Sequence, residues 1–173
     1  MNFGKRNIIL IGMPGAGKST LGVLLAKALG MSFTDTDLLI QQREQRLLQD
    51  IINGEGIDNF LKIEERVLLS LDTDGIENTI IATGGSAVYS ERAMKAFKNK
   101  SLIVYLHVDY SEIEKRITDI KTRGIVLKSG NSLSDTYKER LPLYEKYADI
   151  TIDCTNKSIE ESIEQIIAQL SKR

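Results

Sequence analysis

The sequence predicts an α/β fold in which a parallel sheet of five strands is covered by helices on both faces. Three observations lead to this prediction. Short aliphatic runs alternate with segments of helical apolar spacing along the whole chain. A glycine-rich loop at residues 12–20 connects the first of these runs to the first helical segment. The 173 residues, with a mass of 19.3 kDa, are enough for one domain with a substantial core.

The predicted elements follow in chain order. Short β-rich runs predict strands at residues 7–11, 32–34, 79–82, 101–106 and 150–152, of which the first reads as a buried parallel strand and the fourth is strongly apolar. Helical apolar spacing marks residues 21–28, 38–48, 60–68, 90–97, 111–122 and 137–147, and a last helix after Ser158. Gly54 and Gly56 are expected to separate the second helix from the third. Residues 123–134 contain two glycines and little periodicity, which predicts a mobile loop.

Capping signals support several of these helix boundaries. Gly30 follows the first helix and is expected to cap its C-terminus in the left-handed conformation. Two serines carry a glutamate three residues later, which is the capping-box pattern of a helix start. These pairs are Ser111 with Glu114 and Ser158 with Glu161.

Composition limits the classes of function. A net charge of −1 predicts no general affinity for nucleic acid, and a charged fraction of 27% is ordinary for a globular protein. Cys154 is the only cysteine, so an internal disulfide or a cysteine metal cluster is excluded and a reducing, cytoplasmic setting is expected. The first residues run directly into a predicted strand, so we expect no signal peptide. No apolar run approaches membrane-spanning length, so we expect no membrane partner.

Residues 12–20 fit the pattern G-x-x-x-x-G-K-[ST] between a buried strand and a helix. Glycines let the backbone N–H groups point inward, and the helix N-terminus adds a partial positive charge, so the loop is suited to the phosphates of ATP. Lys18 is expected to reach the β- and γ-phosphates, and the Ser19 hydroxyl to bind Mg²⁺. The alternative is a glycine-rich turn with a purely structural use. The candidate nucleotide-binding residues are Gly15, Ala16, Gly17, Lys18, Ser19 and Thr20.

Asp35 and Asp37 follow the second predicted strand, at the sheet edge where α/β proteins bind ligands. Alternation would place both side chains on one side if the chain stays extended there. Asp35 could then hold Mg²⁺ through its water shell, and Asp37 could accept a proton from a substrate hydroxyl. The alternative is an Asx turn or a helix cap, because aspartate favours both.

Gly84 and Gly85 end the third predicted strand. Two glycines there permit a small ligand to approach the backbone closely, although an ordinary strand-to-helix turn has the same composition.

Three arginines, Arg116, Arg123 and Arg140, are spaced around the predicted mobile loop. An arginine on a closing lid can stabilise the charge that develops during phosphoryl transfer, and Arg123 opens the loop. For any single surface arginine the alternative is a solvated charge.

Taken together, these residues resemble the shikimate kinases, which belong to the P-loop kinases of the nucleoside-monophosphate-kinase-like group. The similarity runs from Ile8 to about Lys157. It includes the loop at residues 12–20, Asp35-Thr-Asp37, Phe60-x-x-x-Glu64, Gly84-Gly85, Arg123 and Arg140-Leu-Pro-Leu-Tyr144.

The resemblance implies a three-layer P-loop NTPase fold with a mobile lid. The chain would be one kinase domain over residues 1–173, with a substrate-binding region at about 35–65 and the lid at about 123–135. It also implies transfer of the γ-phosphoryl group of ATP to shikimate, which gives shikimate 3-phosphate in aromatic amino-acid biosynthesis. Magnesium would be required, and the enzyme would be a cytoplasmic monomer.

The resemblance also implies residue roles. Ser19 and Asp35 would hold the metal, and Lys18, Asp37 and Arg123 would be catalytic. Arg116, Lys157 and Arg123 would contact the nucleotide. The acceptor would contact Asp37, Glu64, Gly84, Gly85 and Arg140.

Three positions depart from the pattern of the family. Leu61 stands where the family has an arginine that helps to clamp the shikimate carboxylate. A charge-assisted bond of that kind contributes roughly 1.5–3 kcal/mol, and leucine supplies none of it. Lys62 is a poor substitute, because neighbours on a helix point about 100° apart. Ser86 replaces a third glycine, and residues 124–126 read Gly-Ile-Val where the family usually has Pro-Leu-Leu.

These departures suggest alternatives. Arg140 could bind a carboxylate while Glu64 and Asp37 bind an ammonium, so that the acceptor would be a small hydroxy amino acid. Shikimate is preferred because the remaining pattern is complete. A nucleotide-binding regulatory protein with little catalysis is a second alternative, which intact Lys18 and Arg123 disfavour. A nucleoside monophosphate kinase is a third, although Asp37 suits a polyol or an ammonium better than an anion.

Overall fold

The computed structural model describes residues 7–73, 75–118, 126–127 and 130–172. Within them the strands are β1 (Asn7–Ile11), β2 (Ser32–Asp35), β3 (Thr79–Ala82), β4 (Ser101–His107) and β5 (Ile150–Asp153). The α-helices are α1 (Lys18–Leu29), α2 (Thr36–Glu44), α3 (Leu48–Glu55), α4 (Ile57–Thr73), α5 (Glu91–Lys100), α6 (Tyr110–Thr118), α7 (Leu133–Tyr147) and α8 (Ile159–Leu170). A short 3-10 helix, η1 (Ala87–Tyr89), follows β3.

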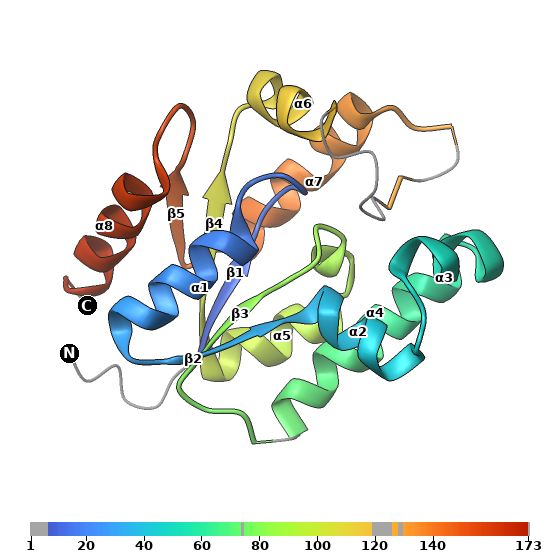
Figure 1. The fold of residues 1–173 in the computed structure, drawn as a ribbon, viewed down its shortest axis with the longest axis horizontal. Helices are drawn as coiled ribbons and strands as arrows, with labels where there is room; N and C mark the ends of the chain where they lie inside the picture. Colours follow the sequence, from blue (N-terminus) through green and yellow to red (C-terminus); the bar gives the residue numbers. More distant parts are fainter. Residues whose placement is uncertain (1–6, 74, 119–125, 128–129, 173) are drawn as a thin grey trace.

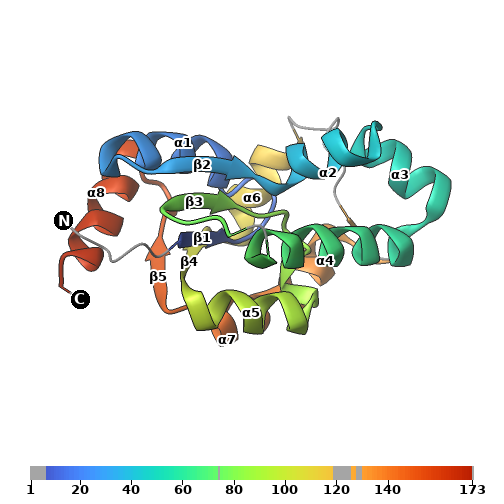
Figure 2. The same cartoon turned by 90° about the horizontal axis from the view of Figure 1, so that it is seen from below.

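The five strands form one parallel sheet in the order β2-β3-β1-β4-β5. Helices α1 and α8 cover one face of this sheet, and α5 and α7 cover the other (Figures 1 and 2). The predicted three-layer fold with a five-stranded parallel sheet is therefore confirmed. β1 lies in the centre, where the strand order changes direction, and ligands of such sheets bind beyond the carboxyl ends at that point.

Apolar side chains form two buried clusters. The larger one contains the strands β1, β3 and β4 and the faces of the helices that pack on them. β1 and β3 are buried on both faces, which explains why they lack polar alternation, whereas buried and exposed residues alternate in β5. The smaller cluster holds α2, α3 and α4 together at one side of the molecule, on the right in Figure 1. It consists of Ile40, Leu48, Ile51, Phe60, Ile63, Val67 and Val126. Residues 35–65 thus pack largely around a core of their own.

Two of the predicted caps are confirmed. Gly30 ends α1 in the left-handed conformation, with φ of 66°, and its N–H donates to the carbonyl of Ala26. Ser158 and Glu161 form the expected capping box at the start of α8.

The helix predicted at 38–48 is wrong as a single element. α2 begins at Thr36 and ends where Gln45 adopts a left-handed conformation with φ of 53°, and α3 begins only at Leu48. Nothing in the composition of this polar segment marks the break, because it contains neither glycine nor proline. Of the two predicted breakers, Gly54 lies inside α3 and Gly56 caps its C-terminus.

Two further boundaries are corrected. Ser111 is not an N-cap, because α6 already begins at Tyr110; Glu114 accepts a hydrogen bond from the Tyr110 hydroxyl instead. Helix α7 begins at Leu133, capped by Ser132, so residues 133 and 134 belong to a helix rather than to the predicted loop. The predicted end of the preceding helix at 119–122 lies outside the described residues. Among the described helices, none has the length and apolar character needed to cross a membrane.

Candidate functional site

The loop between β1 and α1 has the backbone geometry of a phosphate cradle. Gly12, Gly15 and Gly17 have φ of 147°, 81° and 90°, which side-chain-bearing residues rarely adopt. A Cβ at Gly12 would also lie 2.7 Å from the carbonyl oxygen of Leu106. Lys18 is buried, and its ammonium donates to the carbonyls of Gly12 and Met13, each at 2.8 Å. The loop and the N-terminus of α1 therefore present N–H groups and one cation to the same side.

Asp35 connects this loop to the second strand. The Ser19 hydroxyl donates to Asp35 Oδ2 at 2.6 Å. Asp35 is also the N-cap of α2, and its Oδ1 accepts from the N–H groups of Asp37 and Leu38. The chain therefore does not stay extended after Asp35, and the expected alternation of Asp35 with Asp37 is wrong. A hydroxyl and a carboxylate in contact are nevertheless a donor set that suits Mg²⁺.

Asp37 lies in the first turn of α2, where it meets the turn after β3. A Cβ at Gly84 would lie 2.5 Å from Glu64 Oε1 and 2.8 Å from Asp37 Oδ1, so both carboxyl groups crowd this glycine. The N–H of Gly84 donates to Thr36 Oγ1 at 3.1 Å, which ties the turn to α2. Two acids from different helices are thus brought to the same backbone position.

Arg140 supplies the cation of the site from α7. It is 1% exposed, and two of its nitrogens are bound: Nη2 donates to the Val126 carbonyl at 2.6 Å and Nε to the Tyr89 hydroxyl at 3.2 Å. The guanidinium also lies 5.1 Å from the centre of the Tyr89 ring. Its Nη1 is buried and has no hydrogen-bond partner within the described part of the chain. A Cβ at Gly85 would lie 3.0 Å from that atom, so Arg140 Nη1 points at the glycine turn.

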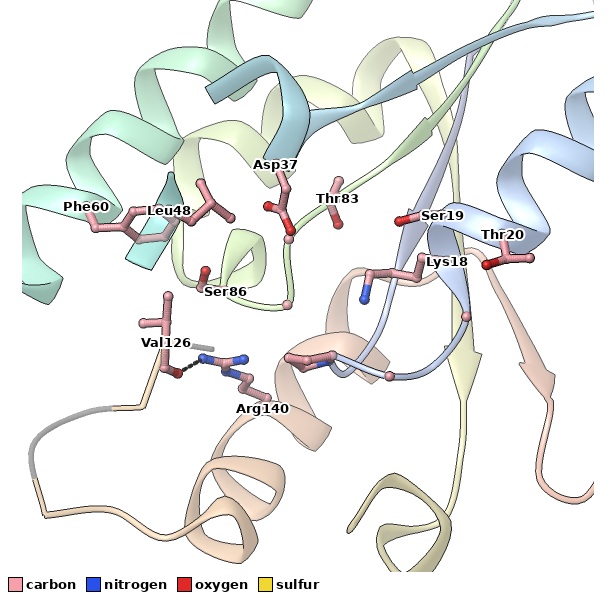
Figure 3. Close-up of a pocket in the computed structure, with 15 residues that line it drawn as sticks. Lys18, Ser19, Thr20, Asp37, Leu48, Phe60, Thr83, Ser86, Val126 and Arg140 are labelled. Atoms are coloured by element: carbon pink, nitrogen blue, oxygen red, sulfur yellow. Dashed lines mark hydrogen bonds between the residues drawn. The ribbon is translucent and has the colours of Figure 1, made fainter. Parts of the chain in front are cut away.

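The phosphate loop, Asp37, the turn after β3 and Arg140 line one pocket at the carboxyl ends of the strands, whereas Asp35 and Glu64 do not line it (Figure 3). The phosphate loop forms one wall, Asp37 and the turn at residues 83–86 form the floor, and Arg140 lies opposite. Leu48, Phe60 and Val126 supply an apolar side. The pocket therefore combines a phosphate cradle with an acid, a cation and an apolar surface.

The apolar wall and the partners of Arg140 were missed by sequence reasoning. Leu48 and Val126 have the composition of ordinary core residues, and Tyr89 lies in a 3-10 helix that no periodicity marks. Tyr144 holds the glycine turn through a 2.7 Å hydrogen bond to the Gly85 carbonyl. The R-x-P-L-Y motif was the only signal for Tyr144. Leu61 does not line the pocket and packs against the smaller apolar cluster.

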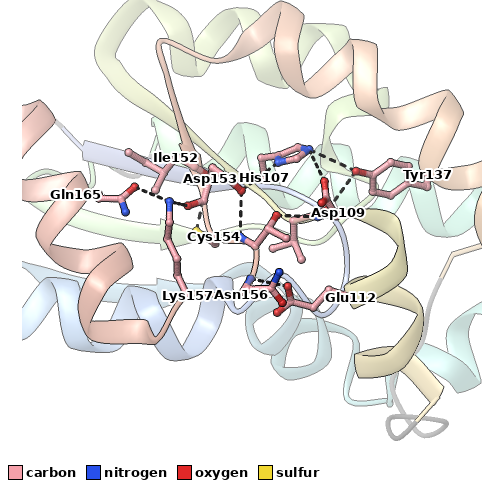
Figure 4. Close-up of polar contacts among 12 residues, drawn as sticks. His107, Asp109, Glu112, Tyr137, Ile152, Asp153, Cys154, Asn156, Lys157 and Gln165 are labelled. Carbon is pink, nitrogen blue, oxygen red and sulfur yellow. Dashed lines mark hydrogen bonds and ion pairs between the residues drawn. The ribbon is translucent and has the colours of Figure 1, made fainter.

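A second cavity adjoins the other side of the phosphate loop. Arg116 and Lys157 both line it, together with Thr20 and Cys154. Arg116 donates to the Gly15 carbonyl at 3.0 Å and pairs with Glu112. Figure 4 shows Lys157 beside the β5 end, where its ammonium donates to the Asp153 carbonyl at 2.7 Å. The two residues expected near adenine therefore share one cavity next to the loop. Arg123, the predicted lid arginine, lies outside the described residues.

Comparisons with known proteins agree with this architecture. The model of the family described as shikimate kinase matches residues 14–171. A shikimate kinase of Haemophilus influenzae is 35% identical over 94% of this chain and 91% of its own length. One from Bacillus cytotoxicus is 36% identical over 96% and 99%. The structure of a shikimate kinase from Acinetobacter baumannii in complex with shikimate superposes with a TM-score of 0.90 and 29% identity, covering 99% of this chain and 96% of the other. This chain therefore belongs to the shikimate kinase family.

Proposed function

We propose that this protein transfers the γ-phosphoryl group of ATP to a hydroxyl of shikimate, giving shikimate 3-phosphate and ADP. The observation that carries the proposal is the single pocket in which the phosphate loop faces Asp37 and Arg140. Relatives named shikimate kinase at about 35% identity, and the similar fold of one with shikimate bound, support this acceptor over a hydroxy amino acid.

On the nucleotide side, the triphosphate would lie against the N–H groups of residues 15–20, with Lys18 at the β- and γ-phosphates. Arg116 and Lys157 would border the adenine, since they share the cavity beside the loop. The oxygens of Ser19 and Asp35 fit Mg²⁺, which prefers hard ligands and retains several waters. When bound there, the metal would neutralise charge on the phosphates.

On the acceptor side, Arg140 Nη1 would bind the carboxylate of shikimate. This role is supported by the burial of Nη1, which has no hydrogen-bond partner among the described residues. Asp37 would orient the reacting hydroxyl and accept its proton as the oxygen attacks the γ-phosphorus and ADP departs. Gly84 and Gly85 would allow the ring of the acceptor to approach the backbone. Arg123, on a lid that would end before α7 begins at Leu133, would stabilise the charge on the transferred group.

An acceptor screen at fixed Mg·ATP tests this proposal. Release of ADP is followed with shikimate, serine, threonine and homoserine, and the product is identified by mass and ³¹P NMR. With shikimate we expect kcat/KM of about 10⁴ M⁻¹s⁻¹ or higher, as for an enzyme acting on its own substrate. Turnover of homoserine but not shikimate would overturn the proposed acceptor. Tight ATP binding without ADP release for any acceptor would indicate a nucleotide-binding protein instead.

We further propose that the protein works as a cytoplasmic monomer. The nearly balanced charge and the single, buried Cys154 support this, because neither a disulfide nor a strongly charged binding surface is implied. Light scattering after gel filtration measures the mass directly, and a value near 19.3 kDa is expected.

A further inference from the structure

Glu64 is an acid buried behind the acceptor site. It lies on α4 and is 2% exposed, and its Oε1 has no hydrogen-bond partner within the described part of the chain. It does not line the pocket itself. Its Oε1 would be 2.5 Å from a Cβ at Gly84, a glycine that does line it. Glu64 therefore lies behind the pocket floor and does not form part of its wall.

The surroundings of Glu64 favour a neutral carboxyl group. Burial raises its pKa to about 8; the Ser86 hydroxyl and the charges of Arg140 and Lys18 oppose this rise, and the charge of Asp37 adds to it. The phenol of Tyr144 is the other titratable group coupled to it. These neighbours come from α2, α7, the phosphate loop and the turn after β3. Desolvation thus outweighs the two cations.

The sequence of α4 lacks a basic residue that could pair with the buried acid. Residues three apart on a helix share a face, so a base at position 61 could pair with Glu64. That position is Leu61, which packs against the smaller apolar cluster, and the adjacent Lys62 is exposed. An apolar neighbour at this position adds to desolvation and supplies no charge.

We propose that Glu64 is a positioning residue that serves the acceptor site as a neutral carboxylic acid, so that no second negative charge develops beside Asp37 when an anionic acceptor binds. This inference rests on the proposed function, because the acceptor carries a carboxylate. Ionisation of Glu64 places that second charge behind Gly84, in contact with the floor on which the acceptor lies. Acceptor binding is weakened as a result, whereas the nucleotide on the far side of the pocket is affected less.

The consequence is a particular pH dependence. At pH 9 about one tenth of the molecules retain the neutral form, so KM for shikimate rises about tenfold from pH 7 to pH 9 if only that form binds. The KM for Mg·ATP changes much less over the same range. A merely structural Glu64 would not separate the two constants.

Three variants test the assignment. Glu64→Gln cannot ionise, so its KM for shikimate at pH 9 stays within about twofold of its own value at pH 7. Leu61→Arg supplies the missing base, which pairs with the ionised Glu64. The KM of this variant for shikimate therefore also changes little between pH 7 and pH 9. Leu61→Met is the matched control, since it keeps the volume without the charge and retains the rise of the unmodified protein. The proposal is overturned if KM for shikimate rises as much between pH 7 and pH 9 in the Glu64→Gln variant as in the unmodified protein. It is also overturned if KM does not rise in the unmodified protein.

A direct titration separates this inference from the proposed function. In protein carrying ¹³C at the glutamate side-chain carboxyl carbons, the resonance missing from Glu64→Gln belongs to Glu64. Its titration midpoint is expected near pH 8, and a midpoint below pH 6 overturns the proposal without any acceptor being present. If shikimate is not phosphorylated at any pH, the proposed function fails while the protonation of Glu64 is still decided by this measurement.

Discussion

At the scale of single residues, Gly84 is a position near the acceptor where an added carbon atom would meet both carboxyl groups of the site. Gly84→Ala would place a Cβ 2.5 Å from Glu64 Oε1 and 2.8 Å from Asp37 Oδ1, so at least one carboxyl group must move. Because displacements near 1 Å can cost about 100-fold in rate, kcat/KM for shikimate is expected to fall about 10- to 100-fold.

The matched control for this prediction is Gly54→Ala in α3. A Cβ there meets no atom within 4 Å, so activity should be unchanged and stability should rise by about 0.5–1 kcal/mol. Steady-state kinetics and thermal unfolding measure both effects. Equal activities of the two variants would contradict the close approach at Gly84.

Asp37 carries the second prediction at this scale. Asp37→Asn removes the carboxylate that orients the acceptor hydroxyl, and kcat should fall about 10²- to 10⁴-fold while ATP still binds. Titration calorimetry with ATP and a coupled kinetic assay separate binding from turnover. Asp50→Asn, an exposed aspartate on α3, is the control and should leave kcat within about twofold. A kcat close to that of the unmodified protein in Asp37→Asn would remove the proposed role.

The raised pKa of Glu64 also predicts how stability depends on pH. Between its ordinary value of 4.5 and about 8, the unfolded chain releases the proton that the native protein keeps. Stability is therefore lost as the pH rises through this window, by about 1 kcal/mol for each pH unit.

Glu64→Gln is free of this loss, so its melting temperature relative to the unmodified protein should increase from pH 5 to pH 8 and then level off. For a domain of this size the change is about 2–4 °C per pH unit. Calorimetry at several pH values measures it. A difference that stays constant from pH 5 to pH 8 would mean that Glu64 titrates normally.

At the scale of elements, the two capping-box patterns of the sequence give opposite outcomes. Ser158 accepts from the Glu161 N–H and caps α8, whereas Ser111 lies inside α6. Ser158→Ala should therefore cost about 1 kcal/mol, and Ser111→Ala should be neutral or slightly stabilising. Urea unfolding measures the free energy of unfolding of both variants. An equal loss of stability in the two would show that α6 begins later than in the structure.

The elements also show where sequence patterns are informative. β1, β3 and β4 were located to within one residue, because each is an unbroken apolar run that must be buried on both faces. The separation of α2 from α3 was not predictable, since it occurs where Gln45, neither glycine nor asparagine, takes a left-handed conformation, and Leu48 and Ile51 of α3 then pack in the smaller cluster. The chain was expected to stay extended from Asp35 to Asp37, but Asp35 ends β2 and caps α2, which is the alternative that the sequence left open, because its carboxylate satisfies two N–H groups at the start of that helix.

At the scale of the whole molecule, the phosphate loop follows the central strand β1 and joins the larger apolar cluster through Met13 and Ala16. Ligands that bind only the native state stabilise it, by about 2.7 kcal/mol at a concentration of 100 Kd. Saturating Mg·ADP should therefore raise the melting temperature by about 5–10 °C. Lys18→Met should lose most of this shift, and a full shift in that variant would place the nucleotide elsewhere.

The order of the strands, the phosphate loop and the place of Asp35 and Asp37 after the second strand could be predicted from the sequence, because each depends on residue types and spacings that are local in the chain. The place of Arg140 at the acceptor was implied only by the family resemblance. The family resemblance added the expectation that Glu64 lies near the acceptor. The effect of having Leu61 in place of an arginine, namely the burial and charge state of Glu64, depended on the tertiary structure. Only the packing of α2, α4 and α7 around the turn after β3 buries Glu64 beside Asp37 and leaves Arg140 Nη1 without a hydrogen-bond partner among the residues that the structure describes. Charge state follows from desolvation, and desolvation is set by residues that are far apart in the sequence.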